Sequence, residues 1–444
     1  MQLTKTDFIS YIISGIKTEE QSKVGLEIEG FLYNKIDFKP LPYLKISDIL
    51  KNLKQVANNQ NINISNVIEN NNLLGLSDNS SNFGNISLEP GAQFEFSSLP
   101  YNNINTLKNS LDKFFEILLP ILEQKNIGLF YMGHHPNLDI KNHLIIPKER
   151  YSIMQNYMPK VGSLGLNMMK ATGTLQANLD FTSEEDLKKK MQVSMALGNI
   201  ISILFMSSPI INAKESGFLS FRNNVWLDTD NARSGILNFA LNGNFSIEQY
   251  IDYALNTPMY LIYRNNKYID ATGIIFKDFI SGKSKIENIE PTFDDFELHL
   301  TTLFPNVRLK KYLEIRTMDA PSTKDFMLAL PALYTGLFYN SDVLDEIYNL
   351  TKSWNYNELI ELQNILPKVG FNAKFKNQSI AEILHYIVLL SYKGLVVRNL
   401  GEEIYLTPLL KLIEQKETIA EQHLKQFKAL NGDINQFIKK ISIN

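Results

Sequence analysis

The sequence predicts an α+β fold built around one antiparallel sheet. Two observations lead to this prediction: four short segments alternate polar with apolar residues, and much of the remaining chain has the apolar spacing of helices. Alternation with a period of two sends successive side chains to opposite faces of a strand. We therefore expect one side of the sheet to face a core and the other side to form a concave polar floor.

The clearest alternating segment spans residues 87–97. Three polar residues, Gln93, Glu95 and Ser97, share one face there, and two phenylalanines share the other. The same pattern recurs in 26–30, 174–181 and 312–316. We predict a strand in each of the four segments.

The polar faces of these predicted strands are acidic. Glu27, Glu29, Glu95 and Glu314 lie on them and lysine does not, although lysine supplies most of the 44 basic residues. An ordinary solvated sheet face, the simpler interpretation of alternation, should carry lysine. Carboxylates this close repel one another unless a cation lies among them, and hard oxygen ligands suit Mg²⁺. The pattern therefore favours a magnesium and phosphate site.

In the first third of the chain, residues 1–17 predict an amphipathic helix, and a second short helix is predicted near 47–57. The Asn-rich run at 58–72 predicts a solvated loop or helix end. Apolar spacing over 104–125 predicts a long helix, which Pro120 should kink.

Later segments predict one loop and several helices. The Gly- and Pro-marked segment 158–165 is either a plain connection or a loop that covers the substrate. Thr182 and Glu185 have capping-box spacing, and predict the start of a helix that runs to about Met206. Beyond Arg316, the predicted helices are 324–348, 379–392 with Gly394 as its C-cap, and 408–430.

Two local motifs suggest functions that other features exclude. His134 and His135 are adjacent, but neighbouring residues point apart on regular structure and no third ligand stands at a zinc-like spacing. We interpret them as loop histidines. Residues 281–284 resemble the end of a phosphate-binding P-loop, but Lys277 stands where that motif requires glycine. Any nucleotide must be held by other means.

The composition excludes several classes of protein. The chain of 444 residues has no cysteine, which rules out disulfides, thiolate nucleophiles and cysteine-ligated metals. A net charge of −3 gives no electrostatic case for binding nucleic acid or an anionic membrane. No uninterrupted apolar run approaches the length of a membrane span, and the N-terminus lacks a signal peptide pattern. We therefore expect a cytoplasmic protein.

Arginine is rare, with seven residues in the chain, and five of them lie between 222 and 316. A chain so poor in arginine is expected to keep it where lysine cannot replace it, as in bidentate binding of carboxylate or phosphate. Arg222 and Arg233 stand near aspartates and aromatic residues. This pattern fits a structural ion-pair corner and a wall that binds an anionic substrate equally well.

Several of these segments, taken together, resemble the plant and alphaproteobacterial type of glutamate-cysteine ligase. The similarity runs nearly collinearly from about residue 24 to the 405–408 region. The segments that carry it are Val24–Glu29, Ile86–Glu95, Pro147–Gly165, Gln176–Phe181, Trp226–Arg233 and Tyr312–Arg316.

The resemblance implies a glutamine synthetase-like fold, with a curved antiparallel sheet, helices packed on its outer side, and ATP and Mg²⁺ on the concave side. It implies one catalytic domain over 1–444, mainly helical from about 320. The implied reaction joins the γ-carboxylate of L-glutamate to L-cysteine through γ-glutamyl phosphate, the first step of glutathione biosynthesis. No nucleic acid or membrane partner is expected, and the protein should be a monomer or homodimer.

The resemblance also implies roles for individual residues. The metal ligands would be Glu27, Glu29, Glu89, Glu95 and Glu314. The catalytic residues would be Glu27, Glu95 and Arg316. The substrate-binding residues would be Arg150, Thr174, Gln176, Asn178, Arg222, Arg233 and Arg264.

Other functions stay open at this stage. A related carboxylate-amine ligase could use another amine acceptor, because the sequence does not reveal what the acceptor pocket admits. The same fold could also serve a guanidino phosphotransferase or a catalytically silent binding protein. The redox control that plant members exert through cysteines is not expected in a chain without cysteine. Family members usually have Gly-Gly where this chain has Gly91-Ala92, which affects local backbone geometry.

Overall fold

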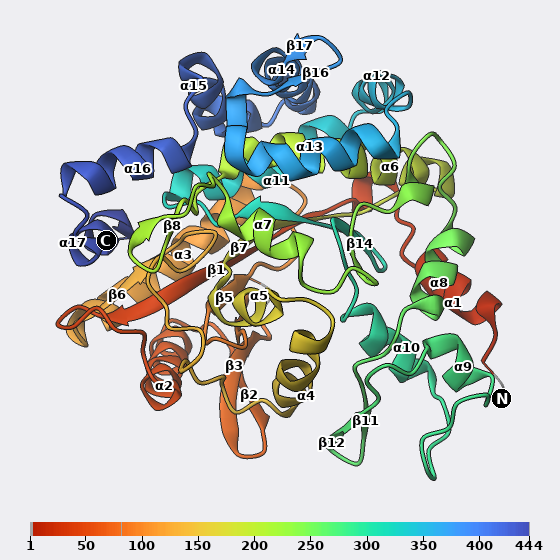
Figure 1. Cartoon of the computed structure of the whole chain (residues 1–444), viewed down its shortest axis with the longest axis horizontal. Helices are drawn as coiled ribbons and strands as arrows, with labels where there is room; N and C mark the ends of the chain where they lie inside the picture. Colours follow the sequence, from red (N-terminus) through yellow and green to blue (C-terminus); the bar gives the residue numbers. More distant parts are fainter. Residues whose placement is uncertain (1–2, 81, 444) are drawn as a thin grey trace.

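A ten-stranded antiparallel sheet forms the centre of the computed structural model, which describes residues 3–80 and 82–443 (Figure 1). Its strands are β1 (Val24–Asn34), β2 (Ile64–Glu69), β3 (Asn72–Asp78), β4 (Asn85–Leu88), β5 (Phe94–Ser97), β6 (Ile127–Phe130), β7 (Thr174–Leu179), β14 (Val307–Leu309), β15 (Leu313–Asp319) and β18 (Ser442–Ile443). The strand order is β14-β15-β7-β1-β5-β4-β3-β2, and β6 pairs with both β1 and β18. The predicted antiparallel sheet is confirmed.

Shorter strands pair in twos outside this sheet. They are β8 (Ile210–Ile211) with β9 (Lys214–Glu215), β10 (Ser234–Gly235) with β13 (Phe304–Pro305), β11 (Leu261–Arg264) with β12 (Lys267–Asp270), and β16 (Lys374–Phe375) with β17 (Gln378–Ser379).

The helices of the N-terminal part are α1 (Lys5–Ile13), α2 (Tyr43–Asn59), α3 (Ile104–Gln124), α4 (Glu149–Tyr157), α5 (Gly165–Ala171), α6 (Glu184–Ser202), α7 (Phe221–Leu227), α8 (Ile247–Asn256), α9 (Phe276–Ile280) and α10 (Phe293–Leu300). The C-terminal helices are α11 (Lys324–Phe338), α12 (Ser341–Thr351), α13 (Tyr356–Val369), α14 (Ile380–Arg398), α15 (Thr407–Gln415), α16 (Ile419–Ala429) and α17 (Ile434–Ile441). The mainly helical C-terminal part agrees with the sequence prediction.

The four predicted strands are neighbours in the sheet, in the order β15-β7-β1-β5. Their register brings polar residues onto a common face: Glu27 on β1 lies opposite Gln176 on β7, and Asn178 on β7 lies opposite Glu314 on β15. Directly opposite residues of an antiparallel pair share one face. Three strands that are far apart in the sequence thus build one polar floor.

The core lies on the apolar side of the sheet, where α2, α3, α6 and α11 pack. Phe96 of β5 stacks on Phe114 of α3, with ring centroids 4.4 Å apart, and both side chains are fully buried. Burying one such side chain contributes about 1.5–3 kcal/mol. The alternation seen in the sequence therefore reflects a floor fixed from behind by a packed core. In Figure 1, α5 and α7 lie in front of the sheet.

Some element predictions were wrong. The Asn-rich run 58–72 starts as a helix end, since α2 ends at Asn59, but most of the rest is not a loop: it belongs to the hairpin of β2 and β3, whose turn uses Asn70 and Asn71 at φ of 49° and 63°. Asparagine tolerates this left-handed region, so the two residues are a turn signal. The predicted helices 324–348 and 408–430 are each broken in two. Helix α6 begins one residue later than predicted, with Ser183 as its N-cap.

Gly394 does not end its helix as predicted. Helix α14 continues to Arg398 and is capped by Asn399 at φ 53°. Gly394 instead lets α14 cross α11 closely, because a Cβ atom there would lie 1.9 Å from the carbonyl oxygen of Gly336. A glycine in a helix can therefore mark a close crossing as well as an end.

Within residues 3–80 and 82–443, α14 is the one helix that is long and apolar enough to cross a membrane by length and composition. The core helix of a globular protein passes the same test, and 56% of its most apolar window is buried. The expectation that no segment spans a membrane therefore stays a prediction.

Candidate active site

A cavity of about 230 Å³ lies over the polar face of the sheet. Strands β1, β5, β7 and β15 supply its floor, and residues in or beside α4, α5 and α7 supply its walls. We call it the central cavity. Its charged lining residues are Glu27, Glu29, Glu89, Glu95, Lys148, Arg150, Arg222, Arg308 and Arg316.

The carboxylates of the floor repel one another. Burial and the nearby Glu89 raise the pKa of Glu29 to about 8, against the opposing charges of Arg222 and Arg316. Burial, with repulsion from Glu89, Glu27 and Glu29, raises the pKa of Glu95 well above its ordinary value. Burial also raises the pKa of Glu27, whose Oε1 accepts a hydrogen bond from Asn178 at 2.8 Å. A bound cation would stabilise the charged forms of these groups.

Glu89 reaches the cavity from the tight turn between β4 and β5. Ala92 closes this turn by donating its backbone N–H to the Glu89 carbonyl at 2.8 Å, and it has φ of 68°. Glycine adopts that conformation without the cost that alanine meets. Gly91 has a different constraint, because a Cβ atom there would lie 2.1 Å from the Lys170 carbonyl oxygen.

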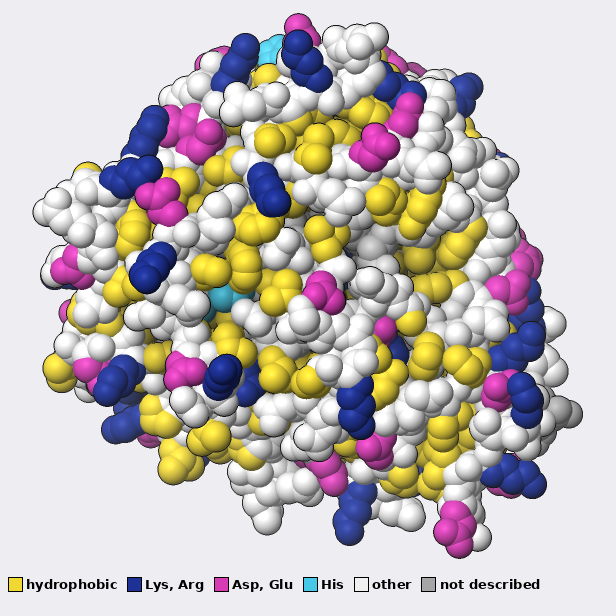
Figure 2. All heavy atoms as spheres, viewed as in Figure 1, with side chains coloured by type: hydrophobic (Ala, Val, Ile, Leu, Met, Phe, Trp, Pro, Cys, Tyr) yellow, Lys and Arg dark blue, Asp and Glu magenta, His cyan; other side chains and the backbone are white. Residues whose placement is uncertain are grey.

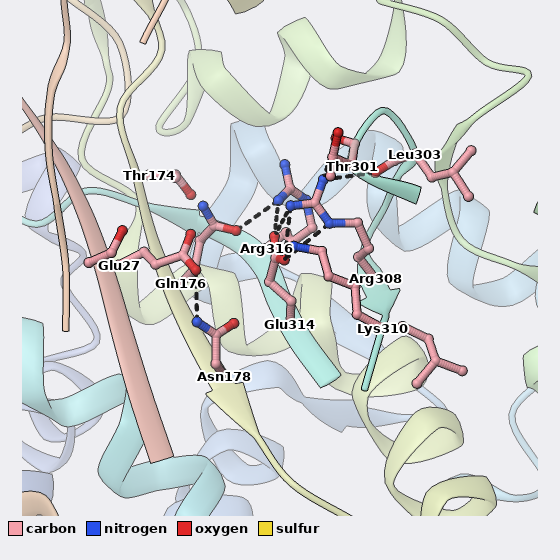
Figure 3. A network of polar contacts seen from close by, with 12 residues as sticks. Glu27, Thr174, Gln176, Asn178, Thr301, Leu303, Arg308, Lys310, Glu314 and Arg316 are labelled. Atoms are coloured by element: carbon pink, nitrogen blue, oxygen red, sulfur yellow. Dashed lines mark hydrogen bonds and ion pairs between the residues drawn. The ribbon is translucent and has the colours of Figure 1, made fainter. Parts of the chain in front are cut away.

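Glu314 differs from the other floor carboxylates because cations surround it (Figure 3). It is fully buried, and Arg308 donates to both of its oxygens, at 2.6 Å to Oε1 and 2.9 Å to Oε2. Lys310 lies 3.3 Å away and Arg316 donates to Oε1. Burial alone would raise the pKa of Glu314, but these three charges hold it far below its ordinary value.

This network also fixes Arg316 beside the floor. Its Nη1 donates to Gln176 Oε1 at 2.8 Å as well as to Glu314. Arg308 is held from the other side by the carbonyls of Thr301 and Leu303, at 2.9 and 3.2 Å. The guanidinium of Arg316 is therefore preorganised at the cavity before any ligand binds.

Arg222 extends from α7 into the cavity and is 2% exposed. Its Nη2 donates to Thr174 Oγ1 and to the Arg316 carbonyl, both at 2.9 Å. Burial lowers its pKa to about 10, against the charges of Asp319 and Glu29. Among the described residues, its Nε and Nη1 and the Nε1 of Trp226 have no hydrogen-bond partner. Buried donors without partners are costly, so an anionic ligand is expected here.

Lys148 and Arg150 form the opposite wall, at the start of α4. Arg150 Nη2 lies 3.4 Å from Thr301 Oγ1, and its buried Nε has no partner among the described residues. Burial lowers the pKa of Lys148, although the charge of Glu89 opposes the shift. Lys148 Nζ also lies 4.9 Å from the centre of the Tyr151 ring.

The structure does not bring Arg233 and Arg264 to the cavity. Arg233 is fully buried, and its guanidinium bonds Asp230 at 2.6 Å and the carbonyls of Thr302 and Pro258. Arg264 forms a bidentate pair with Asp295, at 2.6 Å for both contacts. Their predicted contact with substrate is therefore not supported, and Arg233 follows the alternative of a structural ion-pair corner.

No group of three or more acidic, histidine or cysteine side chains in the described part of the chain is arranged to hold a metal ion. The oxygen-rich floor nevertheless suits Mg²⁺, which commonly uses one or two carboxylates and completes its shell with water and substrate phosphates. His134 and His135 do lie in a loop, but they are buried, and burial lowers the pKa of each, to about 4 and about 3.

Sequence reasoning missed several residues of the site. Arg308 and Lys310 were overlooked, although Val307-Arg308-Leu309-Lys310 alternates polar with apolar residues just before the Glu314 strand. Arg308 is the cross-strand partner of Glu314. Lys148 gave no pattern of its own. Only the fold brings Lys148 to the cavity, where the charge of Glu89 acts on it.

A cavity of about 800 Å³ adjoins the floor at its other end. Glu27 lines both this cavity and the central cavity. Asn178, Lys17, Lys23 and Asn102 are among its other lining residues. We call it the outer cavity. Figure 2 shows acidic, basic and apolar side chains interspersed on the face seen in Figure 1.

Solved structures define the class of the protein by its fold. The chain is similar to the glutamate-cysteine ligase of Francisella tularensis in complex with AMP, with TM-score 0.56, 12% identity, and 96% of this chain and 88% of that chain covered. It is also similar to the bifunctional glutathione synthetase of Pasteurella multocida, with TM-score 0.51, 12% identity, and coverage of 99% and 52%. At this identity the likeness concerns the fold, which is the predicted glutamine synthetase-like α+β fold.

Sequence comparison defines the family. The model of glutamate-cysteine ligase family 2 (GCS2) matches residues 23–439. Glutamate-cysteine ligase A of Oryza sativa subsp. indica is 39% identical over 426 residues, which cover 96% of this chain and 85% of that protein. The Arabidopsis thaliana enzyme is 37% identical over 440 residues, with coverage of 99% and 82%. The chain therefore belongs to the glutamate-cysteine ligase family, and the resemblance seen in the sequence is confirmed.

The same comparison contradicts the predicted location. The Oryza, Nicotiana tabacum and Arabidopsis relatives are named as chloroplastic enzymes. The default of a cytoplasmic protein rested on the absence of targeting signals, and this finding overturns it.

Proposed function

We propose that this chain joins the γ-carboxylate of L-glutamate to the amine of L-cysteine, with conversion of ATP to ADP and phosphate. The observation that carries the proposal is the central cavity itself. An acidic floor lies there beside the buried Arg222 and the partly buried Arg316, and two donors of Arg222 have no partner among the described residues. Family membership supports the ligase class.

The chemistry requires both kinds of charge. A carboxylate is a poor acyl donor, so it is first phosphorylated, and the amine then displaces phosphate from the acyl phosphate. Such transfer depends on positioning and on neutralising the oxygens of the phosphoryl group. Arg316 is held at the floor by Gln176 and Glu314, so it can serve this purpose without reorganising.

The amino acid substrate would occupy the central cavity, and one of its carboxylates would meet Arg222. The Nε and Nη1 of Arg222 and the Nε1 of Trp226, which have no partner in the described part of the chain, are all donors, as a carboxylate requires. Thr174 fixes the remaining nitrogen of Arg222, so the guanidinium presents its free edge in one orientation. Arg150 would bind an anionic group from the opposite wall.

The nucleotide would occupy the outer cavity, because its volume of about 800 Å³ suits a larger ligand than the central cavity does. Since Glu27 lines both cavities, the transferred phosphoryl group would meet the substrate carboxylate near Glu27. Lys17 and Lys23 supply positive charge to the outer cavity.

Mg²⁺ would be held by Glu27, Glu29, Glu89 and Glu95, and when bound it would neutralise phosphate charge. The raised pKa values of Glu27, Glu29 and Glu95 support this assignment, because they arise from burial and from mutual repulsion. Glu314 fits the role less well. Its oxygens are already engaged with three cations, and we propose that it fixes Arg316 instead.

We further propose that residues 1–444 form one catalytic domain. Strand β1 near the N-terminus and β18 at the C-terminal end both pair with β6, so the ends of the described chain share one sheet. The prediction of a monomer or homodimer can be tested by light scattering.

The proposal is tested by measuring ADP release with ATP, Mg²⁺, glutamate and each of the common amino acids in turn. We expect release that requires glutamate and is greatest with cysteine. Release that peaks with another amine would replace the acceptor and keep the ligase class. Release that does not require glutamate would overturn the proposal.

A further inference from the structure

Asp319, at the end of β15, is a buried carboxylate that the proposed chemistry does not use. It is 1% exposed and accepts three hydrogen bonds. Ser207 N and Ser208 Oγ donate to Oδ2 at 3.0 and 2.6 Å, and Ser220 Oγ donates to Oδ1 at 2.8 Å. All three serines are fully buried. Both carboxylate oxygens are thus engaged with the segments that lead into α7.

Two of these serines hold the first turn of α7. Ser220 is the N-cap of the helix, and its Oγ accepts the backbone N–H of Asn223 at 3.0 Å. Ser208 Oγ accepts the backbone N–H of Arg222 at 3.2 Å. Because each hydroxyl accepts from α7, each is free to donate its own proton to Asp319. The carboxylate therefore orients both hydroxyls toward the helix that carries Arg222.

The side chain of Arg222 depends on the same strand. Its Nη2 donates to Thr174 Oγ1 and to the carbonyl of Arg316, which is on β15 as Asp319 is. Asp319 and Thr174 are cross-strand partners in β15 and β7. Asp319 also contributes negative charge near the buried guanidinium. The backbone and the side chain of Arg222 are thus both held by residues at the same end of the β7 and β15 pair.

We propose that Asp319 is a positioning residue for the amino acid substrate: through Ser208 and Ser220 it holds the first turn of α7, so that Arg222 presents its free edge to the substrate carboxylate. The inference rests on the proposed function. It adds a residue that touches no substrate and acts through Arg222.

Asp319→Asn is the main variant. Asparagine has the same shape, but an NH₂ group replaces one carboxylate oxygen and faces a donor. The hydrogen bonds that this oxygen accepted from the serines are therefore lost. We expect the KM for glutamate to rise by about tenfold, as loss of a hydrogen bond to a charged group typically costs. The KM for ATP should change little, because the carboxylate acts on the wall that carries Arg222.

Glu402→Gln is the matched control. Glu402 is also a fully buried carboxylate at the start of a helix, accepting from Ile104 N and Arg398 Nε at 2.7 Å each, and it lines neither cavity. We expect it to lower the midpoint of thermal unfolding without changing the KM for glutamate. A purely structural role for Asp319 would give this same result.

A double-mutant cycle with Arg222→Lys decides whether Asp319 acts through Arg222. We expect the double variant to have the same glutamate KM as Arg222→Lys alone. Once the Arg222 guanidinium is gone, the change at Asp319 has no substrate contact left to disturb. Effects that multiply, or an unchanged KM in Asp319→Asn, would overturn the inference.

If Asp319→Asn does not fold, Ser220→Ala must give a smaller rise in the same KM, and an unchanged KM there would also overturn the inference. Absence of glutamate-dependent ADP release in the wild type would instead contradict the proposed function.

Discussion

Glu29 on β1 is the direct cross-strand partner of Glu95 on β5. Like charges directly opposite one another destabilise a sheet, and burial adds to the cost. The pKa of Glu29 rises to about 8 and that of Glu95 rises well above its ordinary value, in both cases mainly through burial and then through the charge of Glu89. The sheet therefore maintains a repulsion at the site that a bound cation would relieve.

Glu95→Gln should lower kcat by at least about 10²-fold while the protein stays folded, because it removes one of the charges that the cation requires. Removing the repulsion should leave the thermal unfolding midpoint of the ligand-free protein unchanged or higher. Glu116→Gln, on the exposed face of α3, is the control and should change neither quantity. Turnover near that of the wild type at saturating Mg²⁺ would exclude Glu95 as a ligand.

Arg222→Lys should raise the KM for glutamate by about tenfold or more, with a smaller effect on kcat, because a point charge replaces a planar fork. Steady-state kinetics with glutamate as the varied substrate measure the effect. Arg233→Lys is the comparison, since Arg233 is buried away from the cavity and should affect stability alone. An unchanged glutamate KM in Arg222→Lys would count against the substrate contact.

Glu314→Gln should lower the free energy of unfolding by about 3–5 kcal/mol, because it leaves the buried charge of Arg308 and the partly buried charges of Lys310 and Arg316 without a counter-charge. Urea denaturation measures the change. Glu358→Gln breaks a solvent-exposed pair with Lys376 and should have little effect. A loss no greater than that of Glu358→Gln would show that the cations do not depend on Glu314.

Stability should fall in mild acid because four histidines are buried. Burial lowers the pKa of His134 and His423 to about 4, and that of His135 and His299 to about 3. An unfolded histidine has a pKa of about 6.5, so below that pH the unfolded chain binds more protons than the folded chain. Each of these histidines should therefore cost up to about 1.4 kcal/mol per pH unit between about 6.5 and 4.

Urea denaturation at pH 7 and at pH 5 measures this dependence. His299→Gln should reduce the loss of stability between the two pH values, since glutamine does not titrate and can keep the donor to the Ala254 carbonyl. Equal stability of the wild type at both pH values would contradict the burial of neutral histidines.

Sequence patterns located the floor because alternation is a local property. Glu27, Glu95 and Glu314 each stand on a strand whose apolar partners face the core, and this much is visible in a few residues. Register is not local. Nothing in the sequence shows that Glu29 meets Glu95, because that pairing depends on how distant strands align. Arg308 and Glu314 are only six residues apart, but their pairing still depends on the register of the hairpin between β14 and β15.

The arginines show the same limit. Arg233 and Arg264 have a suitable side chain and neighbourhood, yet Arg233 pairs with Asp230 and bonds the carbonyls of Thr302 and Pro258, and Arg264 pairs with Asp295. Asp230 is a near neighbour of Arg233 in the sequence, but the other partners are distant in the sequence and only the fold brings them close. The scarcity of arginine indicated sites that need a planar guanidinium group. It did not distinguish a guanidinium that binds substrate from one that forms a structural ion pair.

Isotope transfer tests the central claim, that the amide forms through an acyl phosphate. Glutamate labelled with heavy oxygen in its γ-carboxylate is supplied with ATP and cysteine, and the released phosphate is analysed by mass spectrometry. Because the amine displaces phosphate at carbon, one carboxylate oxygen must leave with the phosphoryl group. We expect label in the phosphate only when ATP and the acceptor are both present. Formation of the amide with unlabelled phosphate would contradict the account.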